Sequence, residues 1–330
     1  MSSEIIVYAG TTGQGVWRSR DGGETFTRSC AGMFMEAEVR ALAVHPDNPQ
    51  VLFAGTDAGI YRTADGGDHW ERLDTPFAGG KGWQEATLVW SLLIHPRQPD
   101  TLFAGTCPPS IYRSTDGGAS WRKLDVEIEQ ECGPIVYSRV TCLVADPTDD
   151  NVIWAGIEID GVRRSDDGGE NWQRLDEGLS SRDIHGLLVV PDARKTVLAT
   201  TNNDINLSTD ECAVWRPQNV KTKFPWGYCR AITAKADDPH TIFVGNGNGP
   251  PGTAGALHIS RDGGATWRQA ELPVPPNSTI WSFATNPADG NLIFCASING
   301  YLYRTRDGGG TWEKCRHEFG EVRCLAWVEG

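Results

Sequence analysis

Short runs of apolar and β-branched residues recur along the whole chain, and turn-forming residues separate them. In one stretch four such runs follow one another: Val39–His45, Val51–Gly55, Gly59–Thr63 and His69–Leu73. Clusters rich in Pro, Asn and Asp, such as residues 45–49, lie between the runs and are typical of turns. The pattern predicts four short antiparallel β-strands in succession.

One motif accompanies each group of four runs. It reads Ser/Thr-x-Asp-Gly-Gly with Trp or Phe five residues after the aspartate, and its aspartates are Asp21, Asp65, Asp116, Asp167, Asp210, Asp262 and Asp307. Asp and Ser/Thr side chains bond to turn backbones and glycine accepts positive φ, so each box is expected to form a hairpin turn with the aromatic ring packed beside it. The fifth box, Asp210-Glu211-Cys212, lacks both glycines and is expected to form a different turn.

The spacing of these boxes predicts the architecture. Successive aspartates are 43 to 52 residues apart, and four strands in every ~40–50 residues are typical of a β-propeller blade. The chain begins with a run that corresponds to a second strand, Ile5–Gly10, and ends with an unmatched first strand, Glu321–Val328. Pairing these runs completes a blade and removes the open edges of the ring. We predict an all-β fold, a single seven-bladed propeller over residues 1–330, with blades at 5–29 plus 321–328, 39–73, 88–124, 139–175, 183–216, 229–270 and 279–315.

The boxes resemble the Asp-box, or bacterial neuraminidase (BNR), repeats, and the resemblance covers nearly the whole chain. That superfamily includes sialidases, xyloglucan hydrolases, sortilin-type receptors and a photosystem II assembly factor, so the resemblance implies a propeller but several functions. A sialidase would imply an arginine clamp for a carboxylate, yet sialidases have six blades and an Arg-Ile-Pro motif that is absent here. Xyloglucan hydrolases need two propellers with an acid on each, whereas this sequence predicts one.

The charge and cysteine content exclude some functions. The chain carries 43 acidic and 30 basic residues, and its net charge of −13 argues against nucleic acid or an anionic membrane as a partner. The N-terminal residues have no basic region before an apolar stretch, and no segment approaches the ~20 apolar residues of a membrane span. The nine cysteines are an odd number without a CxxC pair. We therefore expect a soluble cytoplasmic protein with reduced thiols, no structural metal and no cofactor.

The two faces of the predicted propeller differ. The Asp boxes join the third and fourth strands of each blade, on the face away from the mouth of the central channel, and we interpret them as structural corners rather than as a catalytic set. The loops on the mouth face are longer, and binding sites usually form on such loops. They include Trp83, Trp226 and the Gly-rich segment 246–255. We interpret that segment as a flexible rim rather than a phosphate cradle, because no helix follows it.

Alignment of the seven innermost strands places one residue of each just inside the mouth. These residues are Arg323, Arg40, Trp90, Thr141, His185, Arg230 and Trp281. Three arginines are unexpected in an acidic protein, and the planar guanidinium suits a carboxylate, phosphate or sulfate. Alternatively each arginine pairs with a nearby acid and holds the blades together; the candidate acids are Glu36, Glu38, Asp57, Glu158, Asp160 and Glu321.

Other candidates for chemistry lie near this ring. His185 is the ring's only histidine and a candidate proton carrier, or else a packing residue. Tyr137 and Tyr228 are candidate acid–base residues on the mouth side. Cys107 and Cys132 also lie on mouth-side loops, but the sequence assigns no base to either thiol. His45 and His95 precede prolines on the other face and are interpreted as turn residues.

Two functions from different classes fit these features. We favour an enzyme of hydrolase or lyase type that binds a small anionic or sugar-like molecule, with Arg40, Arg230, Arg323, Trp90, Trp281 and Thr141 as binding residues and His185, Tyr137 or Tyr228 as acid–base residues. The alternative is a non-catalytic propeller that grips a peptide or protein partner on the mouth face, as an assembly or scaffold factor. Its anchors would be Trp83, Trp90, Trp226 and Trp281. A metabolite deep in the channel would favour the enzyme, and a continuous apolar rim would favour the partner.

Overall fold

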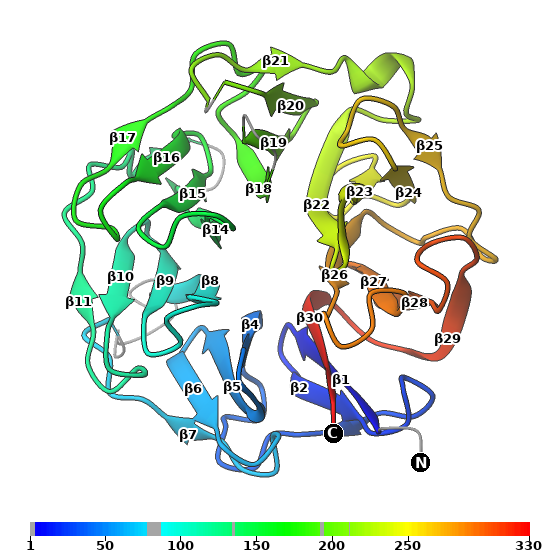
Figure 1. Cartoon of the computed structure of the whole chain (residues 1–330). Coiled ribbons are helices and arrows are strands. Elements are labelled where there is room, and N and C mark those ends of the chain that lie inside the picture. The colour runs from blue at the N-terminus through cyan, green and yellow to red at the C-terminus, as the bar shows by residue number, and fades with distance from the viewer. Residues whose placement is uncertain (1–3, 78–86, 134–135, 192–194, 211) are drawn as a thin grey trace.

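Seven four-stranded antiparallel sheets are arranged radially around a central channel (Figure 1). The computed structural model describes residues 4–77, 87–133, 136–191, 195–210 and 212–330. The prediction of an all-β, seven-bladed propeller is confirmed. Trp83, which the sequence nominates as an anchor, lies outside the described residues.

The strands occupy equivalent places in every blade. The innermost strands are β30 (Val322–Glu329), β4 (Val39–His45), β8 (Leu88–Ile94), β14 (Val140–Ala145), β18 (Ile184–Val190), β22 (Tyr228–Lys235) and β26 (Ile280–Ala284). The second strands are β1 (Ile5–Thr11), β5 (Asn48–Thr56), β9 (Leu102–Cys107), β15 (Ile153–Ile157), β19 (Thr196–Thr201), β23 (Asp238–Gly247) and β27 (Ile293–Ser297). The third strands are β2 (Gly15–Ser19), β6 (Gly59–Thr63), β10 (Ile111–Ser114), β16 (Gly161–Ser165), β20 (Ile205–Ser208), β24 (Gly255–Ser260) and β28 (Tyr301–Thr305).

The outermost strands are short in most blades. They are β3 (Thr27–Arg28), β7 (Glu71–Arg72), β11 (Arg122–Lys123), β17 (Gln173–Arg174), β21 (Arg216–Pro217), β25 (Arg268–Gln269) and β29 (Glu313–Glu318). A separate hairpin, β12 (Glu131–Cys132) and β13 (Val136–Tyr137), precedes β14, and a 3₁₀ helix, η1 (Val220–Thr222), precedes β22. No helix of the described residues has the length and apolar character needed to cross a membrane.

The two ends of the chain close the ring. Strand β1 pairs antiparallel with β30, with Ile5 opposite Glu329 and Tyr8 opposite Ala326. The first blade therefore contains strands from both termini, as Figure 1 shows. This confirms the predicted closure, which leaves no unpaired innermost strand in the described ring.

Neighbouring blades come close together at a glycine in the second strand of several blades. A Cβ on Gly10 would lie 2.7 Å from Val39 in the next blade, and one on Gly156 would lie 2.6 Å from Ile184 in the next blade. Contacts this short are not tolerated, so at these two positions only glycine lets the innermost strand of the next blade pack. The gaps between blades are filled by apolar side chains from both sides; one cluster joins Tyr8 of the first blade to Trp70 of the second.

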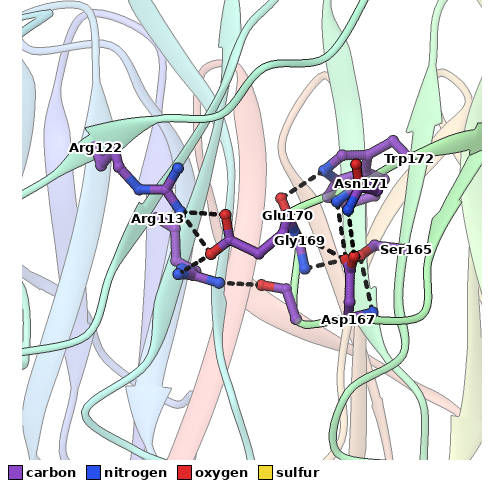
Figure 2. Close-up of polar contacts among 9 residues, drawn as sticks. Arg113, Arg122, Ser165, Asp167, Gly169, Glu170, Asn171 and Trp172 are labelled. Atoms are coloured by element: carbon purple, nitrogen blue, oxygen red, sulfur yellow. Dashed lines mark hydrogen bonds and ion pairs between the residues drawn. The ribbon is translucent and has the colours of Figure 1, made fainter.

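The Asp boxes are hydrogen-bonded corners, as predicted. In the fourth blade, Asp167 accepts bonds from the Ser165 hydroxyl (2.8 Å), from two backbone N–H groups and from the side chain of Asn171 (2.7 Å) (Figure 2). The indole of Trp172 donates to Gly169 O at 3.0 Å. The bonds from Asn171 hold the pKa of Asp167 at about 2, so the carboxylate stays charged at neutral pH.

The fifth box departs from its prediction. Cys212 N donates to Ser208 Oγ at 3.0 Å, and Val214 N donates to Asp210 Oδ1 at 3.3 Å, which are the bonds made in the other boxes. Cys212 adopts a positive φ of 66°, in the same left-handed region as the equivalent glycines of the other boxes, whose φ values are 87–94°. The expectation of a different turn is therefore wrong for its described residues, because the Ser and Asp side chains suffice to hold the corner.

The boxes also join neighbouring blades. Arg113 on β10 donates to Gly168 O and pairs with Glu170, and Arg122 pairs with the same carboxylate at 2.7 Å (Figure 2). Arg304 on β28 donates to Gly22 O in the first blade at 2.6 Å and pairs with Glu24. The corners thus act as links around the ring on the face opposite the mouth.

Turn histidines and thiols behave as structural groups. His45 Nδ1 and His95 Nδ1 accept bonds from the backbone N–H of Asp47 and Arg97, which confirms their role in turns. Seven thiols form no disulfide: Cys30, Cys107, Cys142, Cys229, Cys295, Cys315 and Cys324. No group of three or more His, Cys, Asp or Glu is placed to hold a metal ion in the described part of the chain.

We predict that Arg304→Met lowers the free energy of unfolding by about 1.5–3 kcal/mol, because it leaves buried charge-assisted bonds between the last and first blades unmade. Arg304 is 7% exposed. Urea unfolding measures the effect, with Arg306→Met as the control, since that side chain is 55% exposed and pairs only at 3.7 Å. Equal stability of the two variants would contradict a structural link.

A second prediction concerns pH. His258 is buried with its ring stacked on Phe224 at 3.6 Å, neither ring nitrogen has a hydrogen-bond partner, and burial lowers its pKa to about 4. Between pH 6.5 and 4 the unfolded chain binds this proton and the folded chain does not, so stability falls as the pH falls, by on the order of 3 kcal/mol. His258→Phe should lose less stability than the parent between pH 7 and 4.5. Equal losses on urea unfolding at the two pH values would refute this role.

Candidate functional site

The ring of residues at the channel mouth is produced by seven irregularities in the innermost strands. In the second blade the pairing passes from Val39–Thr56 to Ala41–Gly55 and omits Arg40, and each of the other blades has a corresponding shift. A β-bulge of this kind re-aims a side chain. We call these residues the mouth ring: Arg323, Arg40, Trp90, Thr141, His185, Arg230 and Trp281.

All seven residues of the mouth ring line one cavity of about 240 Å³, the throat of the channel. A wider cavity of about 790 Å³ lies against it and shares His185, Arg230, Trp281 and Arg323. We call this wider space the mouth cavity. Its rim includes Pro250 and Pro251 from the Gly-rich segment 246–255.

A second layer is formed by the residues two positions before the mouth ring, at or just before the start of each innermost strand. Since side chains alternate along a strand, these positions belong to the same wall. Its members Glu321, Arg139, Asp183 and Tyr228 line the mouth cavity, together with Glu158, which follows β15. Arg139 and Asp183 were not singled out from the sequence, although this period of two could have identified them.

Tryptophans hold the arginines of the mouth. The guanidinium carbons of Arg40 and Arg139 lie 4.4 and 4.3 Å from the centre of the Trp90 ring. These arginines come from the blades on either side of Trp90, so the indole lies between them. Such contacts between a cation and an indole face are favourable.

The second tryptophan repeats this arrangement. Arg230 and Arg323 lie 4.1 and 5.2 Å from the centre of the Trp281 ring and come from the blades on either side of it. Both indoles therefore have their faces occupied by guanidinium groups. They hold arginines in place and offer little open surface for stacking.

The arginines differ in their ionic partners. Arg40 pairs with Glu38, Arg323 pairs with Glu321, and Arg139 pairs with Glu158 at 2.5 Å. Pairing with a nearby acid, the structural alternative for these arginines, therefore describes Arg40 and Arg323. Burial, and then the Arg40 charge, lower the pKa of Arg323 to about 10.

Arg230 is the exception. It is only 8% exposed and forms no ion pair with any acid of the described residues, yet it lies on both the throat and the mouth cavity. A buried cation without an ionic partner is costly. Arg230 therefore has unused capacity to bind an anion.

His185, Asp183 and Tyr228 lie beside Arg230. His185 Nδ1 is 2.8 Å from Cys229 O, its Nε2 is 3.4 Å from Asp183 Oδ1, and its ring centre is 4.8 Å from that of Tyr228. Burial, and then the Arg230 charge, lower the pKa of His185 below its ordinary value. Burial raises the pKa of Tyr228, and Arg230 opposes that shift. At neutral pH the imidazole is therefore neutral and the phenol is protonated.

The two carboxyl groups in the mouth cavity have opposite shifts. Burial raises the pKa of Glu158 against the pull of Arg139. Burial also acts on Asp183, but contact with His185 and the nearby arginines outweigh it and lower the pKa of that carboxyl. Two carboxyl groups whose pKa values diverge are suited to act as acid and base.

Several residues predicted from the sequence lie elsewhere. Tyr137 is on β13, is 41% exposed and does not line either cavity, so the structure does not bring this candidate acid–base residue to the site. Trp226 is half-buried and also lies outside both cavities. Burial raises the pKa of Cys107, which disfavours its thiolate as a nucleophile. The side chain of Cys132 lies outside the described residues.

Comparison with known families and sequences identifies relatives. The model of the Sortilin-Vps10 family, described as sortilin, neurotensin receptor 3, matches residues 14–153 and 160–295. A probable oligoxyloglucan-reducing end-specific xyloglucanase of Neosartorya fischeri is 27% identical over 284 residues, which are 82% of this chain and 32% of that protein. The chain thus spans about a third of the length of this curated relative.

Solved structures share the fold. A GH74 xyloglucanase from Xanthomonas campestris matches with a TM-score of 0.70 and 19% identity, over 98% of this chain and 52% of that one. YCF48 bound to D1 peptide matches with a TM-score of 0.64 and 17% identity, over 92% of this chain and 93% of that one. At these identities the likeness establishes the fold alone.

The ionic partners predict how the arginines affect stability. Arg139→Met should lower the free energy of unfolding by about 1–3 kcal/mol, because it leaves the half-buried Glu158 without its partner. Arg230→Met should change it by less than about 1 kcal/mol, because no ion pair is lost. Both arginines contact a tryptophan, so each variant controls for the other. Urea unfolding compares them, and a larger loss for Arg230→Met would show that Arg230 is mainly structural.

Proposed function

The chain belongs to the Sortilin-Vps10 family, and we propose that it binds a small anionic or sugar-like molecule at the mouth of its channel and acts on it as a hydrolase or lyase. The observation that carries this proposal is Arg230, a buried guanidinium that lines both cavities and pairs with no acid in the described part of the chain. A ligand carboxylate, phosphate or sulfate supplies the partner that Arg230 lacks. Arg323 and Arg40 line the same throat, and each of them is paired with its own acid, Glu321 and Glu38.

The tryptophans and Thr141 support the binding site from the side. Trp281 holds Arg230 and Arg323, and Trp90 holds Arg40, so both indoles act through the arginines and not as open stacking walls. Thr141 Oγ1 donates to the backbone, with Ile184 O at 2.7 Å. Its role is to join two blades at the throat.

Two pairs of groups can transfer protons in the mouth cavity. In a lyase reaction, His185 and the phenol of Tyr228 are the two groups that exchange protons with the ligand. In a glycoside hydrolysis, Glu158 with its raised pKa acts as the acid and ionised Asp183 as the base or nucleophile. The similarity to a xyloglucanase supports the hydrolase alternative over the lyase alternative. The xyloglucanase itself is about three times as long as this chain.

A peptide-binding propeller is the second candidate. YCF48, described as bound to D1 peptide, is a propeller, and the match to this chain includes 93% of the YCF48 structure. Exposed apolar side chains lie on segments that lead into innermost strands, namely Phe34, Met35, Val136, Tyr137 and Val274. They are divided among three blades, before β4, β14 and β26, so they support a partner less directly than Arg230 supports an anion.

Ligand binding tests the first proposal. Sodium glucuronate and sodium sulfate should raise the melting temperature of the parent protein, and calorimetry should show roughly 10–100-fold weaker binding to Arg230→Met, because one charge-assisted bond is lost. Arg182→Met is the matched control, since Arg182 lies on the rim of the same cavity, is 58% exposed and pairs with Asp176.

The contrary results separate the two candidates. Equal affinity of Arg230→Met and Arg182→Met for both anions would remove Arg230 from the site. If neither anion binds while a peptide with a free C-terminal carboxylate does, the second candidate replaces the first.

A further inference from the structure

We propose that the mouth cavity takes up one proton together with its anionic ligand, and that this proton lies between His185 and Asp183. The inference rests on the proposed function, since the ligand is the anion held by Arg230. The new element is that binding of the anion and uptake of the proton are coupled: each favours the other.

The geometry leaves the His185–Asp183 pair one proton short. Cys229 O can only accept a hydrogen bond, so Nδ1 of His185, 2.8 Å away, carries the proton of the neutral ring. Nε2 then presents a lone pair to Asp183 Oδ1 at 3.4 Å. That carboxylate oxygen is buried and has no hydrogen-bond donor. Two acceptors thus face each other, and one added proton would satisfy both.

Arg230 and burial exclude this proton in the free protein. Asp183 precedes β18 and attracts the proton, but burial and the Arg230 charge on β22 outweigh it and lower the pKa of His185. The other groups of the surrounding elements are the phenol of Tyr228 on β22, and Glu158 and Arg139, which pair with each other at 2.5 Å. Among the residues that the structure describes, Arg230 is therefore the one positive charge near His185 that has no acid partner of its own.

An anion bound at Arg230 removes this repulsion. Its negative charge offsets the guanidinium charge, so the pKa of His185 rises and a proton enters the pair. The pKa of His185 is then higher in the complex than in the free protein. Between these two pKa values, linkage requires the affinity for the anion to increase as the pH falls, by up to about tenfold per pH unit. The protonated imidazole in turn adds a positive charge beside the ligand.

Glu158 is the competing proton acceptor. Burial raises its pKa, and Arg230 also acts on it by lowering that pKa. An anion at Arg230 would therefore favour protonation of Glu158 as well. Two neutral variants separate the acceptors: His185→Gln removes the first, and Glu158→Gln removes the second.

Calorimetry with sodium sulfate and sodium glucuronate tests the inference, because neither ion changes its charge between pH 5.5 and 8. Binding heats measured in two buffers of different ionisation enthalpy give the number of protons taken up. We expect uptake of up to one proton and tighter binding at lower pH for the parent and for Glu158→Gln. We expect no uptake and a flat pH dependence for His185→Gln.

A ligand-free measurement accompanies it. Nitrogen-15 NMR titration of His185 should give a higher pKa in Arg230→Met than in the parent, and an unchanged pKa in Arg182→Met. Binding that depends on Arg230 but involves no proton uptake would overturn the inference and leave the proposed function intact. An unchanged His185 pKa in Arg230→Met would also overturn it, and failure of both anions to bind would remove the proposed function and the inference together.

Discussion

The close approach of neighbouring blades near the channel axis governs the rest of the structure. At Gly10 and Gly156 the next innermost strand leaves no room for a Cβ atom. Seven innermost strands meet around the axis. Near the channel mouth, each of them has a β-bulge with one residue more than the paired segment of the second strand. The extra residue is forced towards the channel. The positions of the mouth ring therefore follow from the packing of the blades.

Crowding of these side chains creates the chemistry of the mouth. Arg40, Arg230 and Arg323 lie in a confined throat, where water screens their charges poorly. The chain compensates most of this charge locally: Glu38 and Glu321 stand two residues before Arg40 and Arg323 and pair with them. Tryptophans from the intervening blades hold the guanidinium groups by their faces. Arg230 is left without an acid, and its charge acts on His185 instead.

The sequence repeat predicts most of the fold but only part of the site. The box spacing and the unmatched runs at both ends predict the seven blades and their closure, because each blade repeats the same local pattern. The mouth ring can be aligned for the same reason. The arginine–tryptophan contacts could not be predicted, since they join residues of different blades and depend on how the blades pack. Tyr137 lies on the hairpin β12–β13, an insertion outside the repeat, so the repeat does not indicate whether its side chain lines the channel.

The central claim is that an anion binds at Arg230 in the channel mouth. The most direct measurement is a crystal structure of the protein soaked in selenate, a heavy analogue of sulfate, with anomalous data collected at the selenium edge. The account predicts an anomalous peak within hydrogen-bond distance of the Arg230 guanidinium, inside the cavity lined by His185, Tyr228 and Trp281. Selenate bound only at exposed arginines and lysines, with no peak at Arg230, would contradict it.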